Sequence, residues 1–381
     1  MSKGAYIGIN NVAHKIKKGY IGIDGVARKI KKAYIGIGGI ARPCWFEGKI
    51  GYYGTVTELS KPVRAGAASH MGDYALFAGG VYNNVKSCSS IIDGYNRNLT
   101  KFSQINTLSV ARYCLCATHN DNYVIFAGGI NLSGTPLGTV DAYDKYMSKI
   151  PVAGFTRGPG AAAHVGQYAI FFGVTDGYYD VCTYAYDSKL TQIYAGLNAE
   201  IPALDLGNLH PTASTASGAF IVSGGNELHM FNSLLQRTLV SGSFESLDCQ
   251  ASTSIGEYAI FAGGKRGNNS AINTMKYVDK NLTISYGPSL GKGRAGIAAT
   301  HIGEYAIFAF GFSHYDIGRY ADFYDINLTR TFLDDSSNDS TNRHQPRSTH
   351  IGDYALFASN GSYDYLYSSV EEATVHVYAV K

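Results

Sequence analysis

An eleven-residue pattern that recurs about every 47 residues is the feature that most constrains this chain. In its best copies a histidine and an aromatic residue lead into an apolar run that ends in Gly-Gly, as in HMGDYALFAGG at 70–80 and HNDNYVIFAGG at 119–129. Further copies read HVGQYAIFFGV, SIGEYAIFAGG, HIGEYAIFAFG and HIGDYALFASN, and ASGAFIVSGG at 216–225 is a weaker one. Seven units at one period indicate a repeat architecture, in which each unit packs against its neighbours.

Each unit reads as four β-strands. A run of small residues such as GAAS comes first, and a turn leads into the apolar run, which is typical of a strand covered on both faces. Gly-Gly then permits positive φ or a bulge, and a third strand such as VDAYDKYMSK and a fourth strand complete the unit. The aromatic residue that opens the apolar run marks each unit: Tyr74, Tyr123, Tyr168, Phe220, Tyr258, Tyr305 and Tyr354.

The order of apolar run, Gly-Gly, gap and Tyr-Asp resembles the kelch repeat over residues 49–381. The tryptophan of that repeat is missing, and Tyr143, Tyr186 and Tyr324 stand at the third-strand aromatic position. The resemblance implies an all-β fold, a seven-bladed kelch-like β-propeller. We expect the N-terminal strand at 49–60 to pair with the C-terminal strand at 371–381, because this closure removes two open sheet edges.

Histidines and arginines recur with the repeat. His70, His119, His164, His301 and His350 each precede the aromatic residue by four positions. A ring of histidines could hold a metal, but we expect each to make the same turn hydrogen bond in its own blade. Arg64, Arg112, Arg157 and Arg294 recur before the first strand, and we expect hydrogen bonds between blades rather than an anion site. No nucleophile elbow, phosphate loop or paired-carboxylate motif is present, so we predict no enzyme, no catalytic residue, no metal and no cofactor.

The loops after Gly-Gly vary in length and are rich in Tyr, Ser, Asn and Gly. Tyrosine gives a large amphipathic contact at low entropic cost, and loops gathered on one face of a rigid ring form a binding surface. Tyrosines that only cap the blade ends are the structural alternative. The candidate ligand-binding residues on this loop face are Tyr82, Tyr178, Tyr179, Tyr315, Tyr363, Tyr365 and Tyr367.

Residues 1–48 form a different repeat. The segment AYIGINNVAHKIKKGYIGIDGVARKIKKAYIGIGGIARPCWF contains a fourteen-residue unit three times. Five-residue strands flank Asn-Asn, Asp-Gly and Gly-Gly, which favour two-residue hairpin turns, so we predict three β-hairpins. Such thin hairpins need a partner, either the propeller, a second copy or another protein. The candidate attachment or oligomerisation residues are Tyr6, Ile7, Ile9, Tyr20, Ile21, Ile23, Tyr34, Ile35, Ile37 and Trp45.

The tandem AYIGI-type string at 5–46 resembles repeats in tail and minor structural proteins of phages of Gram-positive bacteria. The resemblance implies a virion protein of tail-fibre or receptor-binding type, assembled in the host cytoplasm. Its partners would be other virion structural proteins through residues 1–48 and a host cell-surface component, with a glycan as candidate ligand. A homo-oligomer through the hairpins stays open. The alternatives are a capsid or collar decoration protein, a carbohydrate-active enzyme and an intracellular protein-interaction module.

The distribution of charge, the hydropathy and the cysteine spacing exclude several classes of partner. Residues 1–48 hold nine Lys and Arg against Asp24 and Glu47, but the lysine pairs stand at turns, so we expect no nucleic-acid binding. No apolar stretch approaches the length of a membrane span, and the start lacks a signal-peptide pattern. The six cysteines lack metal-site spacing, and we expect free thiols, with Cys114 and Cys116 small and buried on one strand face.

Overall fold

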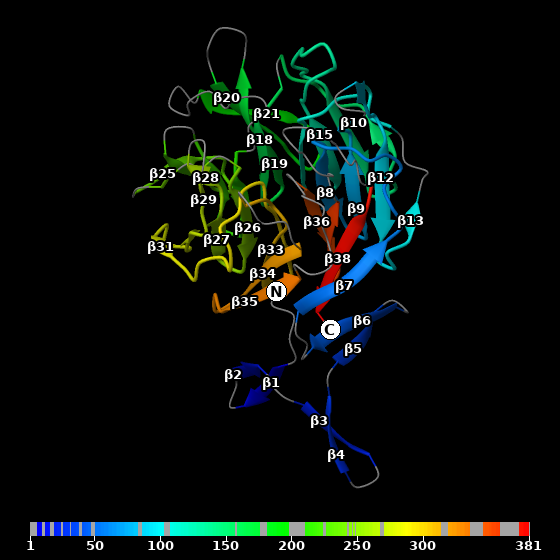
Figure 1. The fold of residues 1–381 in the computed structure, drawn as a ribbon, viewed down its shortest axis with the longest axis vertical. Coiled ribbons are helices and arrows are strands. Elements are labelled where there is room, and N and C mark those ends of the chain that lie inside the picture. Colours follow the sequence, from blue (N-terminus) through cyan, green and yellow to red (C-terminus); the bar gives the residue numbers. More distant parts are fainter. Residues whose placement is uncertain are drawn as a thin grey trace. The chain divides into compact units, whose positions relative to one another are not determined.

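The computed structural model describes residues 50–82, 86–102, 107–156, 158–175, 181–197, 210–223, 226–241, 244–245, 247, 249–266, 270–313, 319–335, 346–358 and 373–380, together with the backbone of six strands within residues 6–46. The chain divides into two compact units, Met1–Tyr52 with Tyr378–Lys381, and Tyr53–Val377. All regular structure in the described residues is β (Figure 1). These residues include no helix that could span a membrane.

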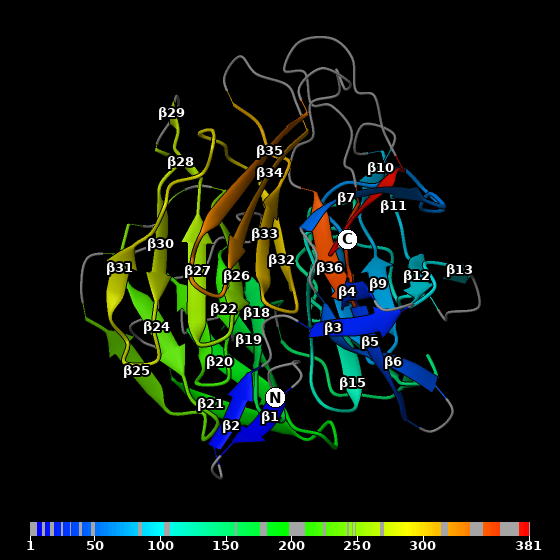
Figure 2. The same ribbon diagram turned by 90° about the horizontal axis from the view of Figure 1, so that it is seen from below.

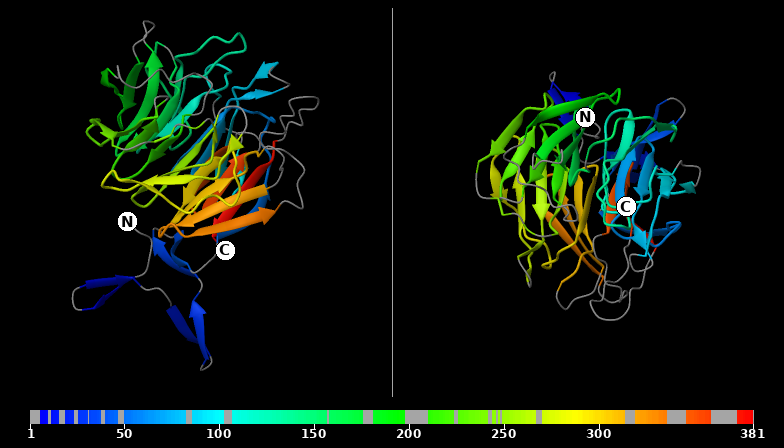
Figure 3. Two further views of the ribbon diagram at one scale, coloured as in Figure 1. Left: turned by 60° about the vertical axis from the view of Figure 1, so that its left-hand side comes forward. Right: turned by 90° about the horizontal axis from the view of Figure 1, so that it is seen from above.

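Seven four-stranded sheets, counted over the described residues, form a seven-bladed β-propeller (Figures 1 and 3). The innermost strands are β8 (Ala67–Met71), β14 (Cys116–His119), β18 (Ala161–Val165), β22 (Thr212–Ser214), β26 (Ala251–Ile255), β32 (Ala298–Ile302) and β36 (Arg347–Ile351). Each packs against the next, and β36 packs against β8, so the ring is closed. The predicted seven-bladed fold is therefore confirmed.

The second strand of each blade is the apolar run seen in the sequence. These strands are β9 (Tyr74–Ala78), β15 (Tyr123–Ala127), β19 (Tyr168–Thr175), β23 (Ala219–Val222), β27 (Tyr258–Ala262), β33 (Tyr305–Ala309) and β37 (Tyr354–Ala358). Leu76 and Phe77 point to opposite faces of β9 and are both buried, because each blade is covered by a neighbour on either side.

The third strands follow after a loop, and the outer strands complete the blades. The third strands are β12 (Ile92–Asn96), β16 (Val140–Asp144), β20 (Val181–Tyr186), β24 (Leu228–Phe231), β30 (Met275–Val278), β34 (Arg319–Asp325) and β38 (Val375–Val380). The outer strands are β13 (Lys101–Phe102), β17 (Lys149–Ile150), β21 (Gln192–Leu197), β25 (Arg237–Val240), β31 (Ile284–Tyr286), β35 (Arg330–Asp335) and β7 (Ile50–Val56). Figure 2 shows β32 to β35 side by side in sequence order. Two small accessory sheets pair β10 (Val81–Tyr82) with β11 (Ser87–Cys88) and β28 (Lys265–Arg266) with β29 (Ser270–Ala271).

One blade combines both ends of the propeller sequence. Its strand order is β36-β37-β38-β7, so the strand that precedes the first repeat lies beside the last one. Further along the chain, the Leu59 N–H donates to the carbonyl of Ala373 at 2.8 Å. Val63 packs in the same apolar cluster as Val375 and Val377. Apolar packing and main-chain hydrogen bonds thus join the first and last segments of this unit.

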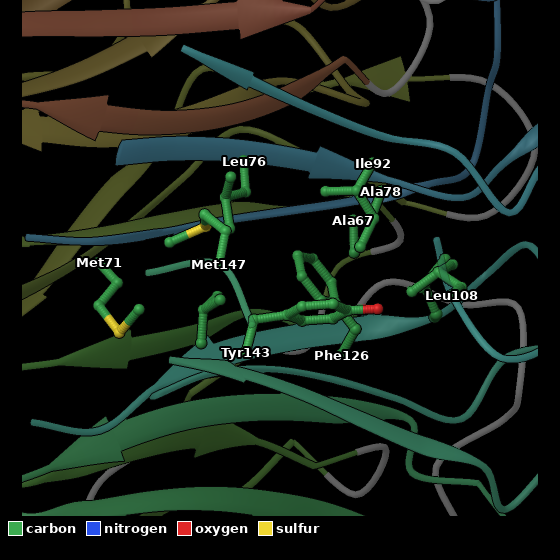
Figure 4. Packing of buried hydrophobic residues seen from close by; sticks show 11 residues of the cluster. Ala67, Met71, Leu76, Ala78, Ile92, Leu108, Phe126, Tyr143 and Met147 are labelled. Atoms are coloured by element: carbon green, nitrogen blue, oxygen red, sulfur yellow. The ribbon is translucent and has the colours of Figure 1, made fainter. Parts of the chain in front are cut away.

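The core lies between blades rather than within one central mass. In the cluster drawn in Figure 4, Leu76 and Ile92 of one blade pack against Phe126 and Tyr143 of the next. Each buried large apolar side chain contributes about 1.5–3 kcal/mol. Between most neighbouring blades the described residues form a comparable cluster.

In the weakest repeat, the expected equivalence of Phe220 with Tyr123 is wrong. Register places Phe231 opposite Ala219, whereas Tyr143 stands opposite Val124, so Ala219 corresponds to Val124. The residue equivalent to Tyr123 is therefore Gly218, and Phe220 lies two positions further along the strand. Side chains alternate between the two faces of a strand every two residues, so a shift of two positions leaves the apolar pattern unchanged. The sequence therefore does not distinguish the two registers.

The N-terminal repeats form three two-stranded antiparallel sheets, as predicted. They pair β1 (Tyr6–Ile9) with β2 (Val12–Lys15), β3 (Gly19–Ile23) with β4 (Val26–Ile30), and β5 (Lys32–Ile37) with β6 (Ile40–Phe46). The closing pair of the first hairpin is Ile9 with Val12, so two residues connect the strands. The same spacing holds in the other two hairpins.

Candidate functional site

A channel lined by the seven innermost strands runs through the centre of the propeller. One cavity of about 150 Å³ takes three consecutive residues from every innermost strand, including residues 68–70, 117–119 and 348–350. A second cavity of about 230 Å³ is lined by residues 65–68, 114–117, 159–162, 210, 212 and 346–348. The two cavities share lining residues such as Ala68 and Ala117, because small side chains on the innermost strands leave the axis open.

Strand direction assigns each cavity to one end of the channel. Ala67 pairs with Ala78, so the start of β8 lies at the end where Gly79 and Gly80 open the variable loop. The 230 Å³ cavity, which begins at Ala65, therefore lies at this loop end, and we call it the loop-end chamber. The opposite end, where Gly72 turns from β8 to β9 with φ of 55°, is the turn end.

The loop-end chamber is asymmetric. Its described lining comes from five of the seven blades and includes glycine, alanine and proline on most sides. The polar side chains in the described lining are Cys114, Cys116, His210, Thr212, Arg347 and Ser348, and it includes no Asp or Glu. Burial raises the pKa of the Cys116 thiol to about 12 and that of Cys114 to about 11, so both are neutral near pH 7.

The five described cysteines with side chains are free thiols, as predicted. Cys114 and Cys116 both line the chamber, but they do not lie on one strand. Cys114 precedes β14 and has φ of 53°, a left-handed conformation that disfavours side chains with a Cβ. Its N–H donates to the carbonyl of Ala65 in the neighbouring blade at 2.6 Å, so the unusual backbone joins two blades.

At the turn end, five histidines line the channel as one group. The same position of the innermost strands carries, in order around the ring, His70, His119, His164, Ser214, Ser254, His301 and His350. Ring centroids are 3.8 Å apart for His70 and His350, and 4.3 Å apart for the other three neighbouring pairs. We call these seven residues the histidine ring.

The imidazoles contact one another rather than the turns. Among the described residues, His350 Nδ1 lies 3.2 Å from Thr300 Oγ1, and the other four rings make no hydrogen bond to the turn. The expected turn hydrogen bond is therefore wrong, because the side chains at this strand position point into the channel. Within the described part of the chain, no group of three or more His, Cys, Asp or Glu has the geometry to hold a metal ion.

Burial keeps the histidine ring neutral. Burial, with a smaller effect from the charge of other imidazoles in the ring, lowers the pKa of His70 to about 3 and that of His301 to about 4. The pKa values of His119 and His350 fall well below the usual range for the same reasons. Burial also lowers the pKa of His164, against the opposing charge of Asp121.

Two of the recurring arginines form buried ion pairs within their own blades. Arg112 Nη2 lies 2.8 Å from Asp141 Oδ2, and both side chains are fully buried. Arg294 pairs with Asp322 in the same way. Burial alone would raise the pKa of Asp141, but hydrogen bonds from Lys149 and Ser109 and the charge of Arg112 hold it below its ordinary value. The predicted hydrogen bonds between blades come instead from the backbone, since the N–H of Gly80 donates to the carbonyl of Arg112.

Arg64 does not belong to this series. Arg64 forms a β-bridge with Val81, as Tyr113 does with Ile130, so Arg64 corresponds to Tyr113. The residue that corresponds to Arg112 is therefore Val63. Arg157 lies outside the described residues. Asp93, which corresponds to Asp141, is instead approached by Arg347 from the last blade. Sequence reasoning missed Arg347 because it stands three rather than seven residues before its histidine.

The predicted loop-face tyrosines are represented by one described residue. Tyr82 ends β10 at the loop end, is half-buried and has Lys61 Nζ 5.7 Å from its ring centroid. The others, Tyr178, Tyr179, Tyr315, Tyr363, Tyr365 and Tyr367, lie outside the described residues. The candidate attachment residues lie on β1, β3, β5 and β6, four of the six hairpin strands, which the structure describes as backbone.

A repeated turn also went unnoticed in the sequence. Asp144 Oδ1 accepts the N–H groups of Tyr146 and Ser148, at 2.8 and 2.9 Å, between the third and outer strands. Met147 in this turn has φ of 62°. Asn or Asp followed three positions later by Leu or Met was the signal, and it recurs at Asp325 and Leu328.

No protein-family model matches the chain, and no curated protein matches it.

Proposed function

We propose that this protein is a phage virion structural protein of tail-fibre or receptor-binding type. In this proposal the N-terminal hairpins attach it to other virion proteins and the propeller binds a host-surface component, with a carbohydrate as candidate ligand. The loop-end chamber carries the proposal, because a cavity of about 230 Å³ lies where the variable loops begin. Concave sites on a rigid scaffold edged by variable loops are where binding proteins hold small ligands.

The repeat resemblances support the two roles. The blades resemble kelch repeats, and variable loops on a rigid scaffold are where binding residues are concentrated. The three hairpins resemble tandem repeats of tail and minor structural proteins, and each is a separate two-stranded sheet. Two-stranded hairpins gain stability from a packing partner, which suits an attachment module.

Binding to host surface is tested with the full chain and cell-wall fragments of Gram-positive bacteria. Tyr82→Ala should weaken retention about 5- to 30-fold, the range for losing an aromatic contact at an interface. Tyr146→Ala is the matched control, because Tyr146 is 76% exposed but lies at the turn end. Equal retention of both variants would contradict binding by the loop face, and no retention of the parent chain would contradict receptor binding.

Attachment is tested on particles. Immunogold labelling of purified phage from a lysate of the source culture should place the protein at the tail tip or on fibres. Removal of residues 1–48 should abolish incorporation. Label on the capsid would show a decoration protein instead, and the absence of label from every particle would refute the virion assignment.

A further inference from the structure

Arg347 is a buried arginine at the wall of the loop-end chamber. It opens β36 at a position where the equivalent residues are Ala67, Cys116, Ala161 and Ala298. Arg347 is only 6% exposed, yet it belongs to the chamber lining. A Cβ placed on Gly66 would touch Arg347 Nη1, so the absence of a side chain at Gly66 creates the space that the guanidinium occupies.

The guanidinium of Arg347 lacks the hydrogen bonds that comparable arginines make. Its one hydrogen bond among the described residues runs from Nη2 to the carbonyl of Val63, at a long 3.4 Å. Nε is buried and has no hydrogen-bond partner, which is also true of Arg112 Nε, so the difference lies at the two terminal nitrogens. By contrast, Arg294 Nη1 donates to two carbonyls at 2.7 and 3.0 Å while Nη2 pairs with Asp322.

The charge of Arg347 is also poorly balanced. Burial lowers its pKa to about 10, although the charge of Asp93 acts in the opposite direction. Asp93 is already held by Lys101 Nζ at 2.9 Å and by the hydroxyl of Ser60 at 2.6 Å. The guanidinium carbon of Arg347 lies 5.8 Å from the centroid of the Phe77 ring, but this contact replaces only part of the hydration that a buried arginine without a paired anion loses.

We propose that the loop-end chamber binds a carboxylate group through Arg347. A carboxylate is the planar acceptor that a guanidinium fork holds with two hydrogen bonds, and the described chamber lining includes no Asp or Glu to repel it. The chamber is smaller than the roughly 300–1,000 Å³ of drug-sized pockets, so the ligand is a small acid or one acidic sugar unit. An acidic sugar rests on the proposed function, whereas a free small acid does not.

The test measures binding of four probes to the full chain by titration calorimetry: acetate, D-lactate, D-glucuronate and D-glucose. Glucuronate should bind at least about tenfold tighter than glucose, which corresponds to about 1.4 kcal/mol. Binding of glucuronate about tenfold tighter than that of acetate and lactate would identify an acidic sugar as the ligand. Comparable affinities for the three acids would identify a free small acid. Equal binding of glucose and glucuronate, or no binding of any acid up to roughly 10 mM, would overturn the proposal.

Variants locate the site. Arg347→Gln should abolish the preference for glucuronate over glucose, and Arg97→Gln should retain it. Arg97 is the matched control, because its half-exposed side chain pairs with Asp73 at the turn end. If Arg347→Gln does not fold, Cys116→Met keeps the arginine and fills the chamber, and should abolish binding of all acids. Unchanged glucuronate binding in Cys116→Met would refute the chamber as the site.

The two proposals can fail separately. If the chain is retained on cell-wall fragments and free glucuronate does not release it, receptor binding stands and the acidic-sugar ligand is overturned. Tight glucuronate binding by a chain that is absent from particles would leave the carboxylate site standing without the virion role.

Discussion

Acid should destabilise the propeller through the histidine ring. The imidazoles are held neutral in the folded protein, with pKa values of about 4 for His301 and about 3 for His70, against 6.5 in the unfolded chain. The unfolded chain therefore binds more protons below pH 6.5. The contribution of each ring histidine is fully present above pH 6.5 and is lost as pH falls toward the folded pKa.

The magnitude follows from these pKa values. At pH 5, protonation lowers the free energy of a histidine in the unfolded chain by roughly 2 kcal/mol. A ring histidine that stays neutral in the folded protein does not have this stabilisation. Five such residues give an upper limit of about 10 kcal/mol, comparable with the whole stability of a typical domain. Water that enters the channel and the charge of Asp121 beside His164 reduce this sum. We expect the melting temperature to fall steeply between pH 6.5 and 4.5.

The chain itself supplies the test variant, because serine occupies the same ring position at Ser214 and Ser254. His301→Ser should lose roughly 0.5–1 kcal/mol at pH 7 through the missing ring contact with His350, and regain roughly 2 kcal/mol relative to the parent at pH 5. Scanning calorimetry of the full chain from pH 7 to 4.5 measures both, with Ser254→Ala as a control whose effect is independent of pH. An unchanged pH dependence in His301→Ser would refute the neutral-ring argument.

Three further predictions concern single contacts, each read from urea unfolding followed by circular dichroism. Asp141→Ala leaves Arg112 buried without its partner and should cost about 3–5 kcal/mol, whereas replacing both with apolar residues should restore most of it. Tyr143→Phe removes a buried hydroxyl that donates to an upstream carbonyl at 2.9 Å, and should cost about 1 kcal/mol; no loss would mean that water replaces the bond. Gly79→Ala should cost at least ~1 kcal/mol more than Gly72→Ala, because both have positive φ but a Cβ on Gly79 would lie 2.7 Å from the Arg112 carbonyl; equal losses would contradict this.

The blades could be predicted from sequence because their signals are local and repeated. The apolar run at 74–78 is buried on both faces, and Gly79 and Gly80 have the positive φ that Gly-Gly suggests. Tyr143 and Tyr324, predicted at the third-strand aromatic position, are fully buried and donate their hydroxyls to upstream carbonyls. Each feature depends on one unit and its neighbour, so a single sequence carries the necessary information.

The channel could be predicted only in part. The histidines were found at one position of the repeat, but their contact depends on the radius of the ring and on the face of the innermost strand that points inward. The period of the sequence contains neither quantity. The same limit explains Cys114, whose positive φ arises from a backbone contact with the neighbouring blade.

The site at Arg347 follows from the closure of the ring, which is why no repeat alignment reveals it. At the position of Arg112 the first blade has Val63, and this leaves Asp93 without an arginine from its own blade. Arg347 enters from the last blade into the space above Gly66, but the described residues give it no hydrogen bond to Asp93. Arg347 of the last blade thus occupies the space beside the first blade without forming an ion pair with Asp93. Arg347 lines the chamber and has no paired carboxylate among the described residues, so the irregularity that closes the propeller also produces the proposed anion site.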